Sequence, residues 1–232
     1  MKLLKAMATI ASFTMLSRIA GMVRDMLTAA ILGAGPLADA FFVALKLPNF
    51  FRRVAGEGAF SVTFIPLYSK TLEKDGEDEA ANFAGQVFSI MAMTLSIFCI
   101  LIMIGMPWVI HVIAPGFDVG TERYELAVTL TRLTFPYLLL MSLTALFGGM
   151  LNTHGKFAPF AAAPIIFNLT LIFTILMMVQ FFPTAGHAMA LGVTVSGIIQ
   201  LAMMVYFIRR YKIVFHFQRA KLTEKSKKLF RL

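Results

Sequence analysis

Residues 15–27 read MLSRIAGMVRDML and place two arginines and an aspartate inside a segment that is otherwise apolar from Leu3 to Leu32. At about 1.5 Å per residue, a helix of this length can cross a hydrocarbon core of about 30 Å. Arg18 follows Lys5 by thirteen residues, which is about 20 Å along such a helix, so a Lys5 at the membrane surface puts Arg18 past the middle of the core. Placing an ionised side chain at that depth in lipid costs at least about 2.5 kcal/mol, which indicates that the side of the helix carrying Arg18 faces the interior of a bundle.

The spacing of the polar residues predicts which side of this helix faces inward. Four residues recur at intervals of four, three and four positions, which places them on one stripe of a helix: Thr14, Arg18, Gly21 and Asp25. Gly21 leaves space beside Arg18 for another backbone or for a ligand. Apolar side chains occupy much of the remaining surface: Ile10, Phe13, Leu16, Val23 and Leu27.

The charges on this helix allow a structural explanation as well as a functional one. Arg18 could form an ion pair with Asp25, two turns away, or with Asp39. Arg24 could extend to the outer membrane surface instead. A functional role is favoured for Arg18, because ionisable residues inside a membrane mark substrate and ion pathways. For Arg24 the sequence leaves the two explanations open.

The composition is that of an integral membrane protein. Hydrophobic residues make up 59% of the 232-residue chain and charged residues 14%, against about a quarter charged in soluble domains, and the mean hydropathy is +0.79. The net charge of +9 does not indicate a nucleic-acid partner, because the basic residues lie at helix ends and in one tail. Cys99 is the single cysteine, so we expect neither a disulfide nor a thiolate metal site.

The sequence carries no motif of a catalytic or cofactor site. It lacks a glycine-rich phosphate-binding loop with its lysine, a His-Glu zinc motif and paired cysteines. We therefore expect neither an enzyme nor a metal or cofactor, apart from a coupling ion or a membrane potential that the sequence does not identify. Asn168 and Gln200 lie inside apolar segments and are expected to bridge helices.

Six apolar segments predict an all-α, polytopic membrane bundle of six transmembrane helices over residues 1–211. Their ranges are 3–32, 36–70, 82–114, 122–152, 158–182 and 187–211. The second segment is interrupted by KLPNFFRRVAGEG (46–58), and a break is expected near Pro48, which denies the helix a backbone donor. Residues 212–232 are basic and amphipathic, which predicts a cytoplasmic linker lying against anionic headgroups.

The distribution of basic residues predicts the orientation in the membrane. With the N-terminus in the cytoplasm, the inner loops and the two chain ends hold fourteen of the 21 lysines and arginines, whereas the outer loops hold Arg123 alone. Because inner loops are enriched in basic residues, both termini are expected in the cytoplasm. The remaining six lie within apolar segments or at the interruption of the second one: Arg18, Arg24, Lys46, Arg52, Arg53 and Arg132.

The second segment repeats the pattern of buried charge. Asp39 precedes Lys46 by seven residues, and four residues share a helical phase that Pro48 interrupts: Lys46, Asn49, Arg53 and Glu57. Arg52 and Arg53 flank a break whose free amides could help to hold an anion, although composition alone slightly favours a plain cytoplasmic turn. In the interior of the first two segments, leaving out Lys5 and Lys70 at their ends, five basic residues stand against three acidic ones. This excess favours a phosphate-bearing ligand over a cation, because guanidinium stays charged when desolvated and offers phosphate a planar fork.

Five stretches carry a family resemblance: LSRIAGMVRD (16–25), GAGPLADAFFVALKLPNFFRRVAGEGAFSVTFIPLYS (33–69), PWVIHVIAPGF (107–117), TRLTFPYLLLMSLTALFGGMLNT (131–153) and FAPFAAAPIIFNL (157–169). Together they closely resemble the MurJ/MviN family, the bacterial lipid II flippases of the wider multidrug/oligosaccharidyl-lipid/polysaccharide exporter group. The resemblance spans nearly the whole chain. It implies a fold of two six-helix lobes and two further helices around a central cationic cavity, located in the bacterial inner membrane.

The resemblance also implies a substrate and a site. The substrate would be lipid II, the undecaprenyl-pyrophosphate-linked peptidoglycan precursor, moved from the inner to the outer leaflet by alternating access. The family's cavity arginines correspond to Arg18, Arg24 and Arg52, which would bind the pyrophosphate. The residues expected to support them or to gate the cavity are Asp25, Asp39, Lys46, Asn49, Arg53 and Glu57.

The sequence stops after the sixth segment and its linker, so we expect an N-terminal portion of a longer protein or a truncated product. Its partners would be lipid II, membrane lipids and the missing C-terminal lobe. Because alternating access requires two lobes, transport by this chain alone is not expected. Two alternatives remain: an exporter of another lipid-linked oligosaccharide or a drug on the same fold, and a non-transporting membrane scaffold whose arginines are all ion-paired.

Overall fold

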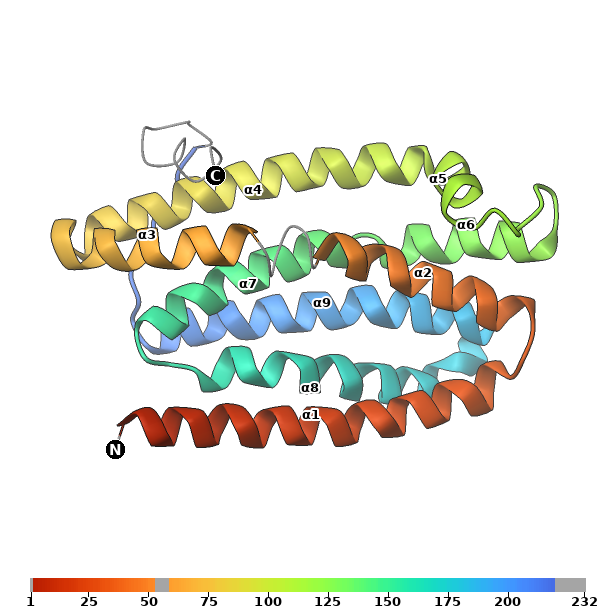
Figure 1. Ribbon diagram of the computed structural model, residues 1–232, viewed down its shortest axis with the longest axis horizontal. Helices are drawn as coiled ribbons and strands as arrows, with labels where there is room; N and C mark the ends of the chain where they lie inside the picture. The colour runs from red at the N-terminus through yellow and green to blue at the C-terminus, as the bar shows by residue number, and fades with distance from the viewer. Residues whose placement is uncertain (1, 53–58, 220–232) are drawn as a thin grey trace.

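The computed structural model describes residues 2–52 and 59–219, and in these ranges it is a bundle of helices without strands (Figure 1). The helices are α1 (Lys2–Leu32), α2 (Pro36–Arg52), α3 (Ala59–Asp75), α4 (Glu77–Ile104), α5 (Met106–Ile113), α6 (Glu122–Thr134), α7 (Tyr137–Thr153), α8 (Ala158–Phe173) and α9 (Ala185–Arg210). A π-helical turn, Thr174–Met178, and a 3₁₀ turn, Val179–Phe181, extend α8. The all-α fold class predicted from the sequence is confirmed.

Four helical stretches in the described part of the chain are long and apolar enough to cross a membrane. They are Glu77–Ile104, Glu122–Thr153, Ala158–Phe181 and Ala185–Arg210. Helix α1 has 31 residues but carries Arg18, Arg24 and Asp25, and α2 and α3 have 17 residues each. The multi-pass character is therefore clear, whereas the number of six spans stays a prediction.

The second predicted segment is divided into α2 and α3, but Pro48 does not end α2, which continues to Arg52. The expected interruption of the register of Lys46 and Asn49 at Pro48 is therefore wrong. Proline cannot donate to the carbonyl four residues earlier, and that carbonyl, on Ala44, accepts instead from the Thr134 hydroxyl of α6 at 2.8 Å. A neighbouring helix thus replaces the missing donor, which is how membrane bundles tolerate proline.

The fourth predicted segment bends at Pro136, which separates α6 from α7. The Thr194 hydroxyl of α9 donates to the carbonyl of Leu133 at 2.5 Å, just before the bend. The carbonyl that Pro136 itself leaves without a donor is that of Arg132, four residues earlier, so the bond from Thr194 fixes α9 against the bend and does not replace the proline's donor.

Besides a small group of Tyr137, Leu171 and Val193, the apolar core forms two large clusters along the bundle. One is built around Phe41, Met106, Leu130 and Phe135, and the other around Phe64, Tyr68, Phe147 and Met150. Helix α2 packs along α6 and α1 along α8, whereas α1 and α2 touch each other only slightly. The two N-terminal helices are thus separated, and the cavity described below is lined by both.

Helix α1 begins and α9 ends at the same end of the bundle (Figure 1). The location of both chain termini in the cytoplasm stays a prediction. After α9, residues 213–218 form an extended strap against α4 and α7. Phe215 lies 5.2 Å from the Phe147 ring, Gln218 Nε2 donates to Asn82 Oδ1 at 2.7 Å, and Ser89 Oγ donates to the Gln218 carbonyl. Residues 220–232 of the predicted linker lie outside the described residues.

Candidate binding cavity

A cavity of about 1380 Å³ opens between α1 and α2, with α7, α8 and α9 completing its wall. Its polar lining contains most of the residues that the sequence singled out on the first two helices. From α1 these are Ser17, Arg18 and Arg24, and from α2 they are Asp39, Lys46 and Asn49. The apolar wall includes Phe42, Val43, Leu45, Phe50, Phe117, Met141, Pro164 and Phe167.

The side of α1 that faces the cavity is turned slightly from the predicted stripe. Arg18 and Gly21 line the cavity as expected, but Thr14 and Asp25 do not belong to the lining. Their places are taken by Ser17 and Arg24, which are four and three positions from Gly21, respectively, and so share its face. The predicted inward orientation of Arg18 is confirmed, and the boundary of the stripe is corrected by less than one turn.

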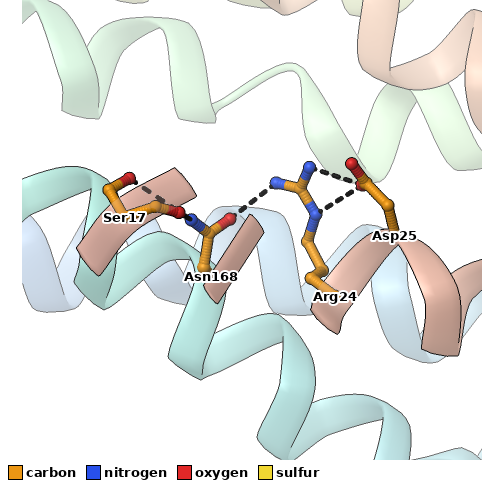
Figure 2. Close-up of polar contacts among 4 residues, drawn as sticks. All are labelled: Ser17, Arg24, Asp25 and Asn168. Atoms are coloured by element: carbon orange, nitrogen blue, oxygen red, sulfur yellow. Dashed lines mark hydrogen bonds and ion pairs between the residues drawn. The ribbon is translucent and has the colours of Figure 1, made fainter. Parts of the chain in front are cut away.

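Arg24 is held by two neighbours (Figure 2). Its Nη1 donates to Asn168 Oδ1 at 2.8 Å, and its Nε and Nη2 donate to Asp25 Oδ1 at 3.0 and 2.6 Å. The guanidinium also lies over the Phe167 ring, 5.4 Å from its centroid. The side chain is 23% exposed, so Arg24 turns into the bundle and does not extend to the membrane surface. The choice that the sequence left open is settled in favour of the interior.

Asn168 bridges α1 and α8, as the sequence predicted. Its Nδ2 donates to the Ser17 carbonyl at 2.9 Å while its Oδ1 accepts from Arg24, and the residue is 5% exposed. Asn168 packs against Gly21, where a Cβ would lie 3.5 Å from Asn168 Nδ2, an ordinary van der Waals distance. The space that Gly21 leaves is thus filled by a side chain of another helix. Gln200 bridges likewise, donating from Nε2 to the Ala163 carbonyl at 3.0 Å.

Arg18 and Lys46 are the unpaired cations of this wall. Both side chains are exposed, and neither forms a hydrogen bond or ion pair with any residue that the structure describes. The two structural explanations for Arg18, pairing with Asp25 or with Asp39, are therefore wrong. Asp25 binds Arg24 instead, and Asp39 binds a residue of α6.

Asp39 forms an ion pair with Arg123, with 3.0 Å between Oδ2 and Nη2. The sequence placed Arg123 in an outer loop and gave no signal for this pairing. Arg132, which the sequence could assign either to the cavity or to the outer surface, donates from Nε to the Met103 carbonyl at 2.9 Å and is absent from the described lining. The Arg52 side chain, Arg53 and Glu57 fall outside what the structure describes, so their predicted roles stay predictions.

Two solved transporter structures have a similar fold. An outward-facing multidrug resistance MATE family transporter of the MOP superfamily superimposes with a TM-score of 0.75 over 97% of this chain and 50% of its own, at 14% identity. An inward-facing one gives 0.72 over 93% and 48%, at 15% identity. At these identities the likeness concerns the fold alone. The bundle has the fold of about half of a MOP-superfamily transporter.

The family follows from closer relatives. The family model described as lipid II flippase MurJ matches residues 28–232. A probable lipid II flippase MurJ from Rhizobium tropici is 38% identical over 100% of this chain and 44% of its own. The lipid II flippase MurJ of Burkholderia cenocepacia is 33% identical over 92% and 42%. A solved lipid II flippase MurJ in an inward closed conformation gives a TM-score of 0.76 at 28% identity, over 96% and 46%. The chain belongs to the lipid II flippase MurJ family.

The chain spans less than half the length of these relatives. Their names describe flippases, which are membrane transporters and not enzymes, in agreement with the prediction from the sequence. The relatives and the apolar helices together identify a multi-pass membrane protein.

Proposed function

We propose that this chain forms the pyrophosphate-binding half of a lipid II flippase of the bacterial inner membrane. The observation that carries the proposal is Arg18, a guanidinium in the cavity wall without an acidic partner among the described residues. Lys46 lies in the same wall, and the carboxylate of Asp39 is engaged by Arg123. A cavity with surplus positive charge suits a doubly anionic phosphate linkage, because guanidinium binds phosphate through two parallel hydrogen bonds.

In this proposal the cavity receives the headgroup while the prenyl tail stays in lipid. Arg18, Arg24 and Arg52 bind the pyrophosphate, and the sugar–peptide part occupies the remaining volume. Asp25 and Asn168 orient Arg24, supported by the bonds of both to its guanidinium. Asn49, Arg53 and Glu57 support or gate the cavity, and Asp39 serves as a latch with Arg123 at the start of α2.

Translocation requires alternating access, in which two lobes rock about the bound substrate. The chain would supply one lobe, with both of its termini in the cytoplasm, and a second lobe would supply the other wall of the cavity. A coupling ion or the membrane potential would drive the cycle. The length that the relatives have beyond this chain is consistent with such a second lobe.

The test is the substitution Arg18→Ala in the complete gene product, reconstituted in liposomes with lipid II. We expect translocation to be lost while membrane insertion is kept, with Arg18→Lys giving partial activity because lysine provides charge without the fork. Arg132→Ala is the matched control, since Arg132 bonds a backbone carbonyl away from the described lining. Retained flipping in Arg18→Ala would refute the role of Arg18.

The alternatives make different predictions in the same preparations. An exporter of another lipid-linked oligosaccharide would retain a different lipid through purification, which native mass spectrometry would identify by mass. A scaffold would lose stability in Arg18→Ala, whereas the proposal predicts little change because Arg18 forms no ion pair or hydrogen bond with a described residue.

A further inference from the structure

Gln200 presents an unusual combination of burial and unfulfilled hydrogen bonding in the cavity wall. The residue is 1% exposed and belongs to the lining, on α9 opposite Ala163 of α8. Its nitrogen is fixed by the Ala163 carbonyl at 3.0 Å, so the other amide atom must be the oxygen. That oxygen is shielded and has no hydrogen-bond partner in the described part of the chain. Buried acceptors in native proteins nearly always have a hydrogen-bond donor, so an unpaired acceptor in a cavity wall indicates that a bound ligand supplies the donor.

The chemistry of the wall limits what that partner can be. Arg18, Arg24 and Lys46 offer donors, which match the acceptor oxygens of a pyrophosphate. Gln200 Oε1 is an acceptor, so it cannot bind ionised phosphate and requires an N–H or O–H group. The sugar–peptide part of the headgroup supplies such groups as hydroxyls and amides. The terminal torsion of glutamine is broad, so the whole amide group can rotate and bring the shielded oxygen to the cavity surface, which lengthens or breaks the bond of the nitrogen to the Ala163 carbonyl.

We infer that Gln200 is a specificity-determining residue that reads the sugar–peptide part of the lipid headgroup through its side-chain oxygen. The inference rests on the proposed function and adds that different residues of one cavity bind different parts of the lipid. The cations of α1 and α2 bind the phosphates, which every polyprenyl pyrophosphate carries. Gln200, on α9, distinguishes a lipid with a glycosylated headgroup from one without it.

The experiment compares two lipids on the 232-residue chain in nanodiscs. Lipid II and undecaprenyl pyrophosphate are titrated separately, and binding is followed by native mass spectrometry. Gln200→Met keeps the length of the side chain but removes its polar atoms. We expect this variant to lose about 2- to 12-fold in affinity for lipid II, the range of one ordinary hydrogen bond, with no change for undecaprenyl pyrophosphate. Arg18→Ala should weaken the binding of both lipids.

Ser196→Ala is the matched control. Ser196 lies one turn earlier on the same helix, is fully buried, and bonds the Val193 carbonyl outside the described lining. It should leave both affinities unchanged. Gln200→Asn, which withdraws the oxygen by one methylene group, provides a second variant should Gln200→Met fail to fold, and should show the same selective loss.

The possible results separate the inference from the proposed function. If Gln200→Met lowers the affinity for both lipids equally, Gln200 contributes to the binding of the pyrophosphate, as Arg18 does, and the inference is overturned. The inference is also overturned if neither affinity changes. In both cases the proposed function stands as long as Arg18→Ala loses both lipids. If the unaltered chain binds neither lipid, the proposed function fails and the inference fails with it.

Discussion

Replacing Asn168 by alanine would remove the main polar connection that the structure shows between α1 and the rest of the bundle. Two interhelical hydrogen bonds would disappear, one from Asn168 Nδ2 to the Ser17 carbonyl at 2.9 Å and one from Arg24 Nη1 to Asn168 Oδ1 at 2.8 Å. Hydrogen bonds between membrane helices contribute about 0.6 kcal/mol on average and at most about 1.7 kcal/mol. Taking the average for the bond to Ser17 and the upper value for the charged bond to Arg24, we expect a loss of about 2 kcal/mol.

The measurement is unfolding by sodium dodecyl sulfate in mixed micelles, followed by circular dichroism. Ser17→Ala is a close control, because the stronger contact of Asn168 is with the Ser17 backbone carbonyl and its contact with the hydroxyl is 3.5 Å long. This control should stay near the unaltered protein. A double-mutant cycle with Arg24→Ala should give a coupling free energy of up to about 1.7 kcal/mol. An additive cycle, with no coupling between the two residues, would refute the reasoning that Asn168 positions Arg24.

Two further predictions concern the frame of the bundle. Thr134→Val leaves the Ala44 carbonyl, four residues before Pro48, without its donor, and should lower the free energy of unfolding by about 1 kcal/mol in the same assay. The control is Thr144→Val, because the Thr144 hydroxyl bonds a carbonyl of its own helix, and this variant should lower the free energy of unfolding clearly less. Equal losses in the two variants would contradict this account of Pro48. Gly85→Ala would place a Cβ against the His216 carbonyl, so it should release residues 213–218 and speed their hydrogen exchange. Gly105→Ala, whose Cβ would meet nothing closer than 3.4 Å, should leave that exchange unchanged, and a protected strap in Gly85→Ala would contradict the observed packing.

The fold was largely accessible from the sequence because hydrophobic length and periodicity act locally. The ends of α1 and α9 fall within two residues of the predicted segments, and the all-helical class followed from the length of the apolar segments. The effect of Pro48 was misjudged for a physical reason. Whether proline ends a helix depends on whether another group satisfies the freed carbonyl, and that group, the Thr134 hydroxyl, comes from ninety residues later in the chain.

The cavity shows the same limit at the level of single side chains. Helical phase brought Arg18, Lys46 and Asn49 to one cavity, because residues on one face of a helix share their surroundings. Phase carries no information about partners on distant helices. The pairing of Asp39 with Arg123, and that of Arg24 with Asn168, depend on how α2 meets α6 and how α1 meets α8. The sequence could predict which face of each helix meets its polar partners, whereas it could not predict which residues those partners are.

The way in which α1 is held has a consequence for movement. Among the described side chains, α1 contributes no member of the buried apolar core, and Thr28 is its one buried residue. Its apolar residues, such as Met15, Ile19 and Met22, are more than half exposed.

Burial of apolar surface supplies most of the free energy that fixes an element in place. In lipid, that contribution is weak between helices, so α1 is held by its packing along α8 and by polar contacts such as the Asn168 bridge. A helix that contributes no side chain to the buried apolar core can detach and return at a lower cost in free energy than a helix of the core. The helix that carries Arg18 and Arg24 is therefore the one best suited to move in the proposed cycle, and an Asn168→Ala variant should shift its position before it unfolds the bundle.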